Sequence, residues 1–429
     1  MDGSVGIGLL GAGTVGGSLI RRLVDEHAAI AAKTGLDLVV ERVAVRNPDK
    51  PRDFHVPEGV LTADAGAVVT DDRVDLVVEV MGGKDPAGDL VLAALEMGKP
   101  VVTANKELIA GRGPELIAAA ERSGVPLLFE AAVGGGIPII RPLAETLAGE
   151  PIERVLGIVN GTTNFILTRM AEEGADYDDA LSEAQVLGFA EQDPTADVSG
   201  ADAAAKAAIL SSLAFGTWVG IDDVYREGID ELSRVDLAYA DDLGYTVKLL
   251  AIAERSAAGI SVRVHPVMLP STHPLAAIRG ATNAIYIEGP SVGELLFAGP
   301  GAGGEPTATA VLGDVIDAAR EMLAGAEVSP SIRFSPGELV DFGGTATKFY
   351  VRLAVDDRPG VLAAIAGAFG ESDVSIKSVW QEGEGSEALL LIVTHSTSEA
   401  QQRAAVAAVA DLEPVREVSA VIRVQSDEP

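Results

Sequence analysis

The stretch 5-VGIGLLGAGTVGGSLIRRLV-24 decides the fold of the N-terminal part of the chain. An apolar run leads into a G-x-G-x-x-G motif, and a helical pattern follows directly, which is the context that this motif requires. Gly11 permits a tight turn, Gly13 lets backbone amides approach a pyrophosphate, and Gly16 lets the helix pack closely on the strand. The helix N-terminus adds amide donors for phosphate. The sequence therefore predicts a Rossmann-type dinucleotide-binding domain whose cofactor contacts are Gly11, Gly13, Thr14, Val15 and Gly16.

The end of the next predicted strand, 38–45, indicates which dinucleotide binds. Domains that prefer NAD usually place Asp or Glu there to hold the ribose 2′-hydroxyl. This chain has Arg46, with Lys50 close by, and a cation suits a 2′-phosphate. NADP is therefore favoured. NAD stays an alternative, because Arg46 could be an ordinary surface residue and Asp49 lies nearby.

Two further segments, 75-DLVVEVMGG-83 and 100-PVVTANKELIA-110, each indicate a strand followed by a loop. Loops at the carboxyl ends of parallel strands line the nucleotide cleft. We therefore expect Gly82 beside the nicotinamide ring, with Thr103 and Lys106 at the cleft. The alternative is that Lys106 simply opens the next helix.

The stretch 199-SGADAAAKAAILSSLAFGTWVG-220 contains a lysine in apolar surroundings, because Lys206 is the single charged residue between Ala203 and Ile221. Ser199 and Asp202 fit a helix N-cap and its acidic partner. Lys206 would then lie one turn after Asp202 on the same face, where an exposed ion pair contributes about 0.3–0.5 kcal/mol. A lysine held near an apolar interior is instead a candidate acid–base group. The residues alone leave both readings open.

A group of carboxylates precedes this lysine. Glu191, Asp193, Asp197 and Asp202 all lie in 184-AQVLGFAEQDPTADVSGADAAAKAA-208. Carboxylates beside a lysine suit a substrate that carries an ammonium group. The alternative is that loop acids are common in so acidic a protein, which has 64 acidic and 32 basic residues.

Composition narrows the class of protein. The net charge of -32 disfavours binding to nucleic acid and to anionic membranes. The absence of cysteine excludes disulfides, thiolate metal sites and covalent thiohemiacetal chemistry. The sequence has no basic leader followed by an apolar run and no uninterrupted segment of membrane-spanning length. We therefore expect a cytoplasmic enzyme.

Taken together, the motifs GAGTVG, TANK, EAAVGGGIP, NGTTNF and AEQDPTADVSGADAAAK resemble homoserine dehydrogenases over nearly the whole chain. The resemblance implies NAD(P)H-dependent reduction of L-aspartate 4-semialdehyde to L-homoserine, on the route to threonine, methionine and isoleucine. It implies that Lys206 donates the proton and that Lys106 is a second active-site lysine. It implies Asp202 as a catalytic residue beside these lysines, and Glu191, Asp197, Gly161 and Thr162 as substrate residues. Phe189 departs from the tyrosine of some members, so a hydroxyl contact is absent there.

The resemblance also implies a domain organisation. The nucleotide domain would comprise residues 1–135 and about 303–340, because a second glycine-rich loop brings Gly301 and Gly303 to the cofactor. Residues 136–302 would form an α+β substrate and dimerisation domain, in a homodimer or homotetramer. A monovalent cation, sodium by expectation, would bind at the turn 130-EAAVGGGI-137 through Glu130, Val133, Gly135 and Ile137.

Residues 348–429 follow a linker, 335–347, and show the pattern β-α-β-β-α-β of a ferredoxin-like domain. The predicted strands are 348–355, 374–380, 387–395 and 417–424, and the predicted helices are 359–370 and 398–410. The segment resembles an ACT-type regulatory domain, which would bind an amino acid such as L-threonine near Asp357, Gly360 and Ser375. The alternative is a passive dimerisation module.

Three other functions compete with this interpretation. Aspartate-semialdehyde dehydrogenase needs a cysteine nucleophile, which this chain lacks. A fusion with aspartate kinase is excluded by the length and by the nucleotide motif at residue 11. A non-catalytic NADP-binding sensor stays the alternative, although the presence of Lys106, Glu191, Asp202 and Lys206 together argues against it.

Overall fold

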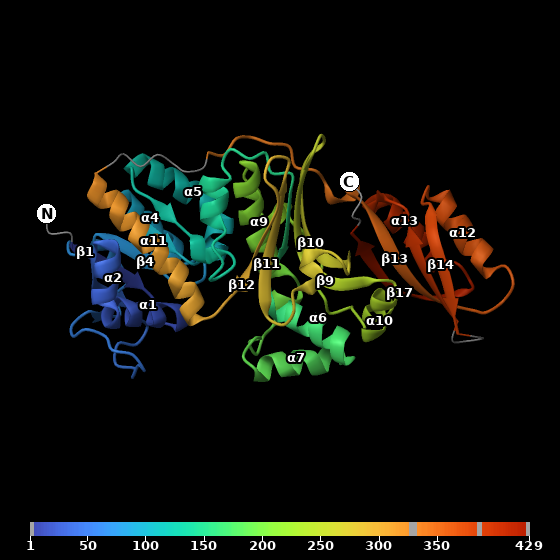
Figure 1. Cartoon of the computed structure of the whole chain (residues 1–429), viewed down its shortest axis with the longest axis horizontal. Helices are drawn as coiled ribbons and strands as arrows, with labels where there is room; N and C mark the ends of the chain where they lie inside the picture. The colour runs from blue at the N-terminus through green and yellow to red at the C-terminus, as the bar shows by residue number, and fades with distance from the viewer. Residues whose placement is uncertain (1–3, 326–332, 384–387, 426–429) are drawn as a thin grey trace. The chain divides into compact units, whose positions relative to one another are not determined.

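The computed structural model describes residues 4–325, 333–383 and 388–425 (Figure 1). It divides into two units. The first comprises residues 1–155, 205–223 and 283–337, and the second comprises 156–204, 224–282 and 338–429. The three-domain boundaries predicted from the sequence stay a prediction. Within the described residues, none of the helices combines the length and the hydropathy needed to cross a bilayer.

The first unit contains a six-stranded parallel sheet in the order β3-β2-β1-β4-β5-β6. The order reverses at β1 and β4, and ligands of such sheets bind where the strand order reverses, at the carboxyl ends. The strands are β1 (Ser4–Leu10), β2 (Asp37–Ala44), β3 (Leu61–Thr62), β4 (Leu76–Glu79), β5 (Val101–Thr103) and β6 (Leu127–Leu128).

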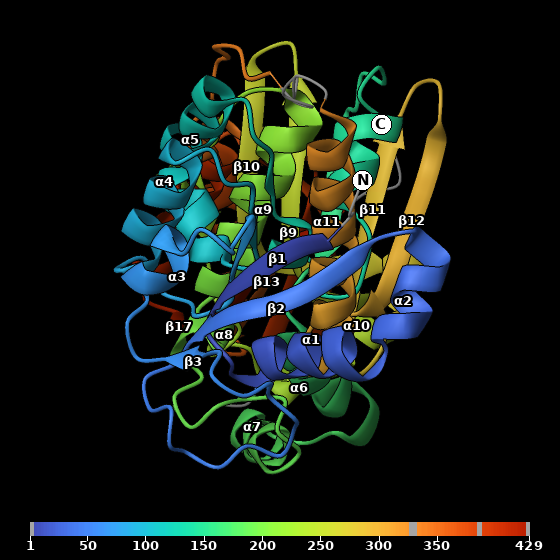
Figure 2. The same ribbon diagram turned by 90° about the vertical axis from the view of Figure 1, so that its left-hand side faces the viewer.

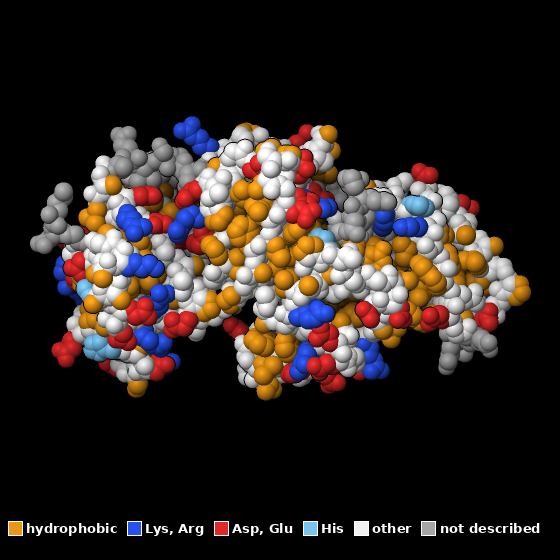
Figure 3. All heavy atoms as spheres, in the orientation of Figure 1, with side chains coloured by type: hydrophobic (Ala, Val, Ile, Leu, Met, Phe, Trp, Pro, Cys, Tyr) orange, Lys and Arg blue, Asp and Glu red, His pale blue; other side chains and the backbone are white. Residues whose placement is uncertain are grey.

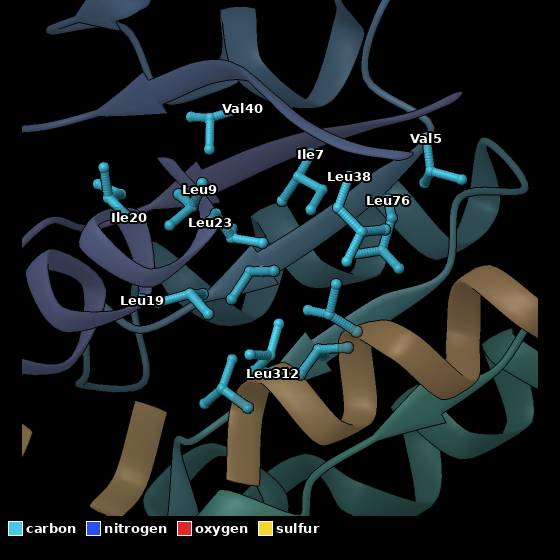
Figure 4. Close-up of a cluster of buried hydrophobic side chains, with 14 of the residues drawn as sticks. Val5, Ile7, Leu9, Leu19, Ile20, Leu23, Leu38, Val40, Leu76 and Leu312 are labelled. Atoms are coloured by element: carbon cyan, nitrogen blue, oxygen red, sulfur yellow. The ribbon is translucent and has the colours of Figure 1, made fainter. Parts of the chain in front are cut away.

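Helices cover both faces of this sheet, as Figure 2 shows. One face carries α3 (Gly66–Thr70), α4 (Ala87–Glu96) and α5 (Lys106–Ser123), with one apolar core beneath them. The other face carries α1 (Thr14–Asp25), which α2 (His27–Thr34) follows, and α11 (Gly304–Ala324), which comes from far along the chain. Leu312 of α11 shares a core with Leu19 and Leu23 of α1 (Figure 4). The apolar stripe of α11 therefore completes this half of the sheet.

The first unit also contains elements outside this sheet and its helices. They are two turns of 3-10 helix, Glu130–Ala132 and Ile221–Asp223, a π-helical turn, Pro142–Thr146, and the strands β11 (Thr282–Gly289) and β12 (Gly293–Pro300). Helix α9 (Ala201–Phe215) begins in the second unit and continues in the first.

The second unit is built on a long antiparallel hairpin, β9 (Tyr245–Ser256) and β10 (Gly259–Pro270), which pairs from Tyr245↔Pro270 to Ser256↔Gly259. Helices α6 and α10 contact β9, and β8 pairs with β10 in parallel. The other elements are β7 (Arg154–Ile158), α6 (Gly161–Glu173), α7 (Tyr177–Val186), α8 (Thr195–Val198), β8 (Tyr225–Arg226), α10 (Arg234–Asp242) and the 3-10 turn Pro274–Ala277.

The C-terminal residues confirm the β-α-β-β-α-β prediction, with strand order β17-β13-β15-β14. The elements are β13 (Ala346–Val355), α12 (Val361–Glu371), β14 (Ile376–Glu382), β15 (Leu389–Thr394), the short β16 (Thr397–Ser398), α13 (Glu399–Ala410) and β17 (Val415–Val424). The predicted strand 387–395 begins at Glu387, which lies outside the described residues. Strand β17 also pairs in parallel with β10, at Val267↔Arg423 and Met268↔Val424. The C-terminal domain therefore extends the sheet of the second unit.

The predicted linker also pairs with this sheet. The amide of Ile260 donates to Glu338 O at 2.9 Å, and the amide of Val340 donates to Ile260 O at 2.8 Å. A 3-10 turn, Phe342–Gly344, then leads into β13. Residues 338–340 of the linker are therefore anchored to β10.

One local expectation from the sequence is wrong. Ser199 does not occupy the N-cap of α9, because it ends α8 and the first α9 bond runs from Ala204 N to Gly200 O at 2.9 Å. His265-Pro266, a pair typical of a turn or strand end, lies inside β10. Proline is tolerated there because β8 pairs with β10 at Arg263 and Val264, while β17 pairs with it at Val267 and Met268.

Candidate active site

The first glycine-rich loop packs closely against its neighbours at two of its glycines and leaves free space at Gly13. Gly11 has φ +109°, and a Cβ there would lie 2.9 Å from Val80 O. A Cβ on Gly16 would lie 2.4 Å from Gly11 O, whereas a Cβ on Gly13 would meet no atom within 4 Å. Gly13 and Thr14 are exposed at the start of α1. The first and third glycines therefore serve packing, and the second leaves room for a ligand.

The second glycine-rich loop lies against the first helix. Gly303, at φ +116°, is the N-cap of α11. A Cβ on the next residue, Gly304, would lie 2.7 Å from Ser18 Oγ and 3.1 Å from Thr14 O. Two helix N-termini therefore start side by side, and both present backbone amides suited to an anion.

Arg46 is exposed two residues beyond the end of β2. The loop after it is held by Arg52, whose guanidinium donates to the carbonyls of Asn47, Pro48 and Lys50 at 2.8–3.1 Å. Arg46 thus follows the carboxyl end of β2, and Lys50 lies in the loop that Arg52 holds.

A buried network that sequence reasoning missed fixes the loops after β4 and β5. Glu79 is fully buried, and its Oε1 accepts from the amides of Met81 at 2.8 Å and Gly82 at 3.1 Å. Its Oε2 accepts from the Thr103 hydroxyl at 2.6 Å. Thr103, a predicted cofactor contact, therefore joins the two loops by its side chain, and Gly82 takes φ +73° between them.

Asn105 continues this network and places Lys106. Its Oδ1 caps α5 by accepting from Leu108 N at 3.1 Å, and its Nδ2 donates to Gly83 O at 2.6 Å. Lys106 is the first residue of α5 and is half-buried. Lys106 opens a helix that begins after the carboxyl end of β5, and its place at the cofactor cleft stays a prediction.

The predicted cation turn is ordered by its own backbone. Both oxygens of the Glu130 carboxylate accept amides at 2.6–2.8 Å, from Ile139, Ile140 and Arg141. Gly134 and Gly135 have φ +74° and +57°, and a Cβ on Gly135 would lie 2.5 Å from Gly301 O. The described residues hold no group of three or more His, Cys, Asp or Glu side chains arranged for a metal. A cation at this turn would therefore rely largely on backbone carbonyls, and the predicted ligands Glu130, Val133, Gly135 and Ile137 stay a prediction.

Asp314 supports this turn from α11. It is 2 % exposed, and it accepts from Glu130 N and from the Arg141 guanidinium, both at 2.8 Å. Burial raises the pKa of Asp314 to about 7 in spite of these donors. The sequence offered no local signal for this contact, because its partners are more than 170 residues away.

Two of the four predicted carboxylates, Asp197 and Asp202, come together on one asparagine. Asn160 Nδ2 donates to Asp197 Oδ1 at 2.7 Å and to Asp202 Oδ2 at 2.8 Å. Its Oδ1 caps α6 by accepting from Thr163 N at 2.9 Å. Asn160 is 5 % exposed and Asp202 is 9 % exposed. Sequence reasoning named both acids but missed the asparagine that joins them, although an Asn between a strand and a helix signals an N-cap.

Gly161, Thr162 and Glu191 divide between α6 and the loop after α7. Gly161 is the first residue of α6, and Thr162 Oγ1 donates to Phe189 O at 2.6 Å. Glu191 is exposed, and Gln185 Nε2 donates to its backbone oxygen at 3.2 Å. Apolar side chains also reach the surface around α7, among them Val186, Leu187 and Phe189 (Figure 3). The structure thus anchors this loop at α6 and leaves the Glu191 carboxylate at the surface.

Lys206 lies one turn after Asp202 on α9 and is half-buried among buried alanines and Ile209. Lys106 and Lys206 both belong to the first unit. Both lysines have interaction partners within the protein.

The predicted regulatory residues lie at two strand ends of the C-terminal domain. Gly360 is the N-cap of α12 at φ +95°, and Gln381 Nε2 of β14 donates to Asp357 Oδ1 at 3.4 Å. The carbonyl of Ser375 accepts from His395 N at 2.8 Å. Asp357, Gly360 and Ser375 are all exposed.

Comparison with known proteins finds chains that resemble this one along its whole length. Residues 11–130 match the NAD-binding domain of homoserine dehydrogenase, residues 138–316 match homoserine dehydrogenase, and residues 349–414 match the ACT domain. A homoserine dehydrogenase of Corynebacterium glutamicum is 47% identical over 429 residues, which cover 99% of this chain and 96% of that protein.

Solved structures agree as well. The crystal structure of a homoserine dehydrogenase from Thiobacillus denitrificans has a TM-score of 0.94 at 42% identity, over 99% of this chain and 98% of that one. A hyperthermophilic archaeal homoserine dehydrogenase in complex with NADPH has a TM-score of 0.61 at 31% identity, over 74% and 98% of the two chains.

Proposed function

The chain belongs to the homoserine dehydrogenase family, whose members interconvert L-aspartate 4-semialdehyde and L-homoserine with a nicotinamide cofactor, and we propose that Asp197, Asp202 and Lys206 form its substrate end. The observation that carries the proposal is the double donation by Asn160, which holds the two carboxylates at 2.7 and 2.8 Å from one nitrogen. Two carboxylates held this close repel each other, so a cation between them is favourable. The ammonium group of the substrate is a cation that this pair of carboxylates attracts.

Lys206 acts on the other end of the substrate. The bound nicotinamide supplies the hydride for the aldehyde carbon. The aldehyde oxygen gains negative charge as hydride arrives, and Lys206 donates a proton to it. Lys106 is the second lysine of the site, held at the start of α5 by Asn105. Glu191 adds a third carboxylate to the substrate side.

The role of the ammonium group can be tested by comparing NADP-dependent oxidation of L-homoserine with that of 4-hydroxybutyrate, which lacks the amino group. A substrate without the charge that the site is built to bind should have a kcat/KM that is lower by about 10- to 150-fold. Similar kcat/KM values for the two alcohols would contradict the assignment of Asp197 and Asp202. Failure of the wild type to oxidise L-homoserine would favour the non-catalytic sensor instead.

The cofactor is proposed to be NADP, because Arg46 follows β2 where an acidic residue would select NAD. The archaeal relative solved with NADPH supports the same preference. Comparing kcat/KM for NADP and NAD in the wild type and in Arg46→Glu tests it. We expect the variant to lose its preference for NADP, and a wild type that prefers NAD would contradict the proposal.

A monovalent cation, sodium by expectation, is proposed at the turn 130–137. The residues fit it through backbone carbonyls, since the left-handed Gly134 and Gly135 bend the turn while the Glu130 carboxylate is occupied by three amides. Replacing sodium by a bulky organic cation should lower activity and the melting temperature. No change in either quantity would contradict the site.

The ACT domain is proposed to bind L-threonine near Asp357, Gly360 and Ser375, and bound threonine is proposed to inhibit the enzyme. Inhibition requires that threonine bind one conformational state of the enzyme better than another. Titrating L-threonine against full-length protein should inhibit the wild type and Asp411→Ala, and inhibit Asp357→Ala less. A wild type that ignores millimolar threonine would favour the passive dimerisation module. We also propose that the protein forms a homodimer or homotetramer and acts in the cytoplasm.

A further inference from the structure

A short strap, residues Glu227–Ile229, runs between two parts of the second unit. It leaves β8, and the amide of Glu227 donates to Val264 O of β10 at 2.8 Å. The amide of Ile229 then donates to Val198 O at the end of α8, at 2.9 Å. The strap therefore connects the central strand β10 to the turn that joins α8 and α9.

Two glycines make this connection a direct contact of backbone with backbone. A Cβ on Gly228 would lie 2.3 Å from Val198 O and 2.9 Å from Ser199 Cα. A Cβ on Gly200, at φ +77°, would lie 3.2 Å from Glu227 O. Because backbone packs directly on backbone with no side chain between, a displacement of the strap also displaces residues 198–200. These residues lie between the two carboxylates that Asn160 holds.

The side chain of Glu227 is held by the C-terminal domain. Arg423 of β17 donates from Nη1 to Glu227 Oε2 at 2.7 Å, and the Tyr225 hydroxyl donates to the same oxygen at 3.0 Å. Arg423 also makes a bidentate pair with Glu399 at the start of α13, at 2.5 and 3.0 Å. It is 6 % exposed. Removing the Glu227 carboxylate would therefore leave the buried guanidinium paired.

An aromatic stack reinforces the same junction. The rings of Tyr225 and Phe342 lie 3.6 Å apart with an interplanar angle of 9°. The guanidinium groups of Arg403, from α13, and Arg423 lie 5.2–5.5 Å from the two ring centroids. Cations at this distance from ring faces attract them. The position of β8, and hence of the strap, depends on α13, β17 and the entry to β13.

We propose that Glu227 is a positioning residue through which the ACT domain sets the placement of Asp197 and Asp202, an inference that rests on the proposed role of these acids as the ammonium site. Helices α12 and α13 share the apolar core of the ACT domain, with Ile365 and Phe369 packed with Ala405 and Val409. The exposed turn before α12 is thereby linked through α13 to Glu399, Arg423 and the strap. Breaking the ion pair between Arg423 and Glu227 weakens homoserine binding and leaves hydride and proton transfer intact.

The test measures KM for L-homoserine, KM for NADP and kcat in full-length Glu227→Ala and Glu227→Gln. Residues in such networks change binding by roughly 2- to 30-fold. We expect Glu227→Ala to raise KM for homoserine within this range with kcat and KM for NADP unchanged, and Glu227→Gln, which keeps an acceptor for Arg423, to raise it less. Glu254→Ala is the matched control, because Glu254 pairs with the buried Arg263 of β10 at 2.7 Å. It should leave all three constants unchanged.

Gly228→Ala tests the strap from its other side, because the added methyl group pushes against Val198 O without touching the ion pair. It should raise KM for homoserine as well. Wild-type KM in Glu227→Ala, or an equal rise in Glu254→Ala, would overturn the proposal. Asp202→Asn separates the two claims. If Asp202→Asn raises KM for homoserine while Glu227→Ala does not, only the positioning role of Glu227 is contradicted. If Asp202→Asn leaves KM for homoserine unchanged, the proposed ammonium site is contradicted.

Discussion

Two asparagines begin helices in the same way but hold different partners. Asn105 in the first unit and Asn160 in the second each follow a strand, and each uses Oδ1 to accept the amide three residues later, at 3.1 and 2.9 Å. The Nδ2 of Asn105 donates to a backbone carbonyl, that of Gly83. The Nδ2 of Asn160 donates to two carboxylates, those of Asp197 and Asp202.

The difference shows how one capping residue serves two kinds of site. Asn105 fixes a loop and the lysine next to it, so its effect is local. Asn160 fixes two charges that arrive from 37 and 42 residues away, and Lys206 follows one turn later on α9. We infer that Asn105 serves the cofactor side of the reaction and that Asn160 serves the substrate side.

The largest effect on turnover is expected at Lys206, which lies one turn after Asp202 on α9. Lys206→Ala should lower kcat by about 10²- to 10⁴-fold, because general acid catalysis contributes that much. NADPH binding, followed by fluorescence, should persist. Lys99→Ala is the control, since Lys99 is also partly buried but donates to Asp71 O at 2.8 Å near the start of β5. Near wild-type turnover in Lys206→Ala would remove this lysine from the mechanism.

Asn160→Asp should have the next largest effect. It places a third carboxylate against Asp197 and Asp202 and removes their shared donor, and the loss of a hydrogen bond to a charged group costs about 1.5–3 kcal/mol. We expect KM for homoserine to rise by roughly 10- to 100-fold. Asn105→Asp, where the new charge faces Gly83 O, should leave that constant nearer the wild-type value. An equal rise of KM for homoserine in both variants would contradict the difference drawn between Asn160 and Asn105.

Glu79→Ala tests whether Asn105 holds its loop alone. The substitution leaves the amides of Met81 and Gly82 without the acceptor that they share, which costs roughly 1–3 kcal/mol of stability. Thermal unfolding should show this loss. Glu115→Ala, which removes an exposed pair with Arg112 on α5, should cost under about 1 kcal/mol. Equal stability of the two variants would mean that Asn105 holds the loop after β4 without Glu79.

The smallest effect concerns pH and the helix that Asn160 caps. Lys248 is 2 % exposed and donates to Asn164 Oδ1 of α6 at 2.9 Å, and burial lowers its pKa from 10.5 to about 8. Between these values the unfolded chain binds more protons than the folded one, so this group makes stability rise with pH from about 8 to 10.5. The stability difference between wild type and Lys248→Met should therefore shift in favour of the wild type across this window. A constant difference would contradict the shift.

The sequence predicted what short motifs encode. GAGTVG, the TANK lysine and the alternation of the C-terminal strands and helices all depend on neighbours in the chain, and the structure has these elements where they were expected. Of the acids named in 191–202, the structure brings Asp197 and Asp202 together. Their convergence on Asn160 could not be read, because it depends on how α6, α8 and α9 meet.

Local rules also misled where tertiary pairing overrode them. Ser199 and Asp202 fit a capping pattern, yet Asp202 accepts from Asn160, and Gly200, which precedes α9, accepts the first helical amide, from Ala204. His265-Pro266 fits a turn, yet a gap between two partners of β10 accommodates the proline. Asp314 and Arg423 gave no sequence signal, since each is a charged residue whose partners lie in distant segments.

The most direct test of the two-asparagine account is a crossed measurement of KM for L-homoserine and KM for NADP in Asn160→Ala and Asn105→Ala. The account predicts that Asn160→Ala raises KM for homoserine by roughly tenfold or more and leaves KM for NADP unchanged. It predicts that Asn105→Ala raises KM for NADP or lowers kcat, with a smaller change in KM for homoserine. If both variants move the same constant to the same extent, the division between a cofactor-side and a substrate-side asparagine is wrong.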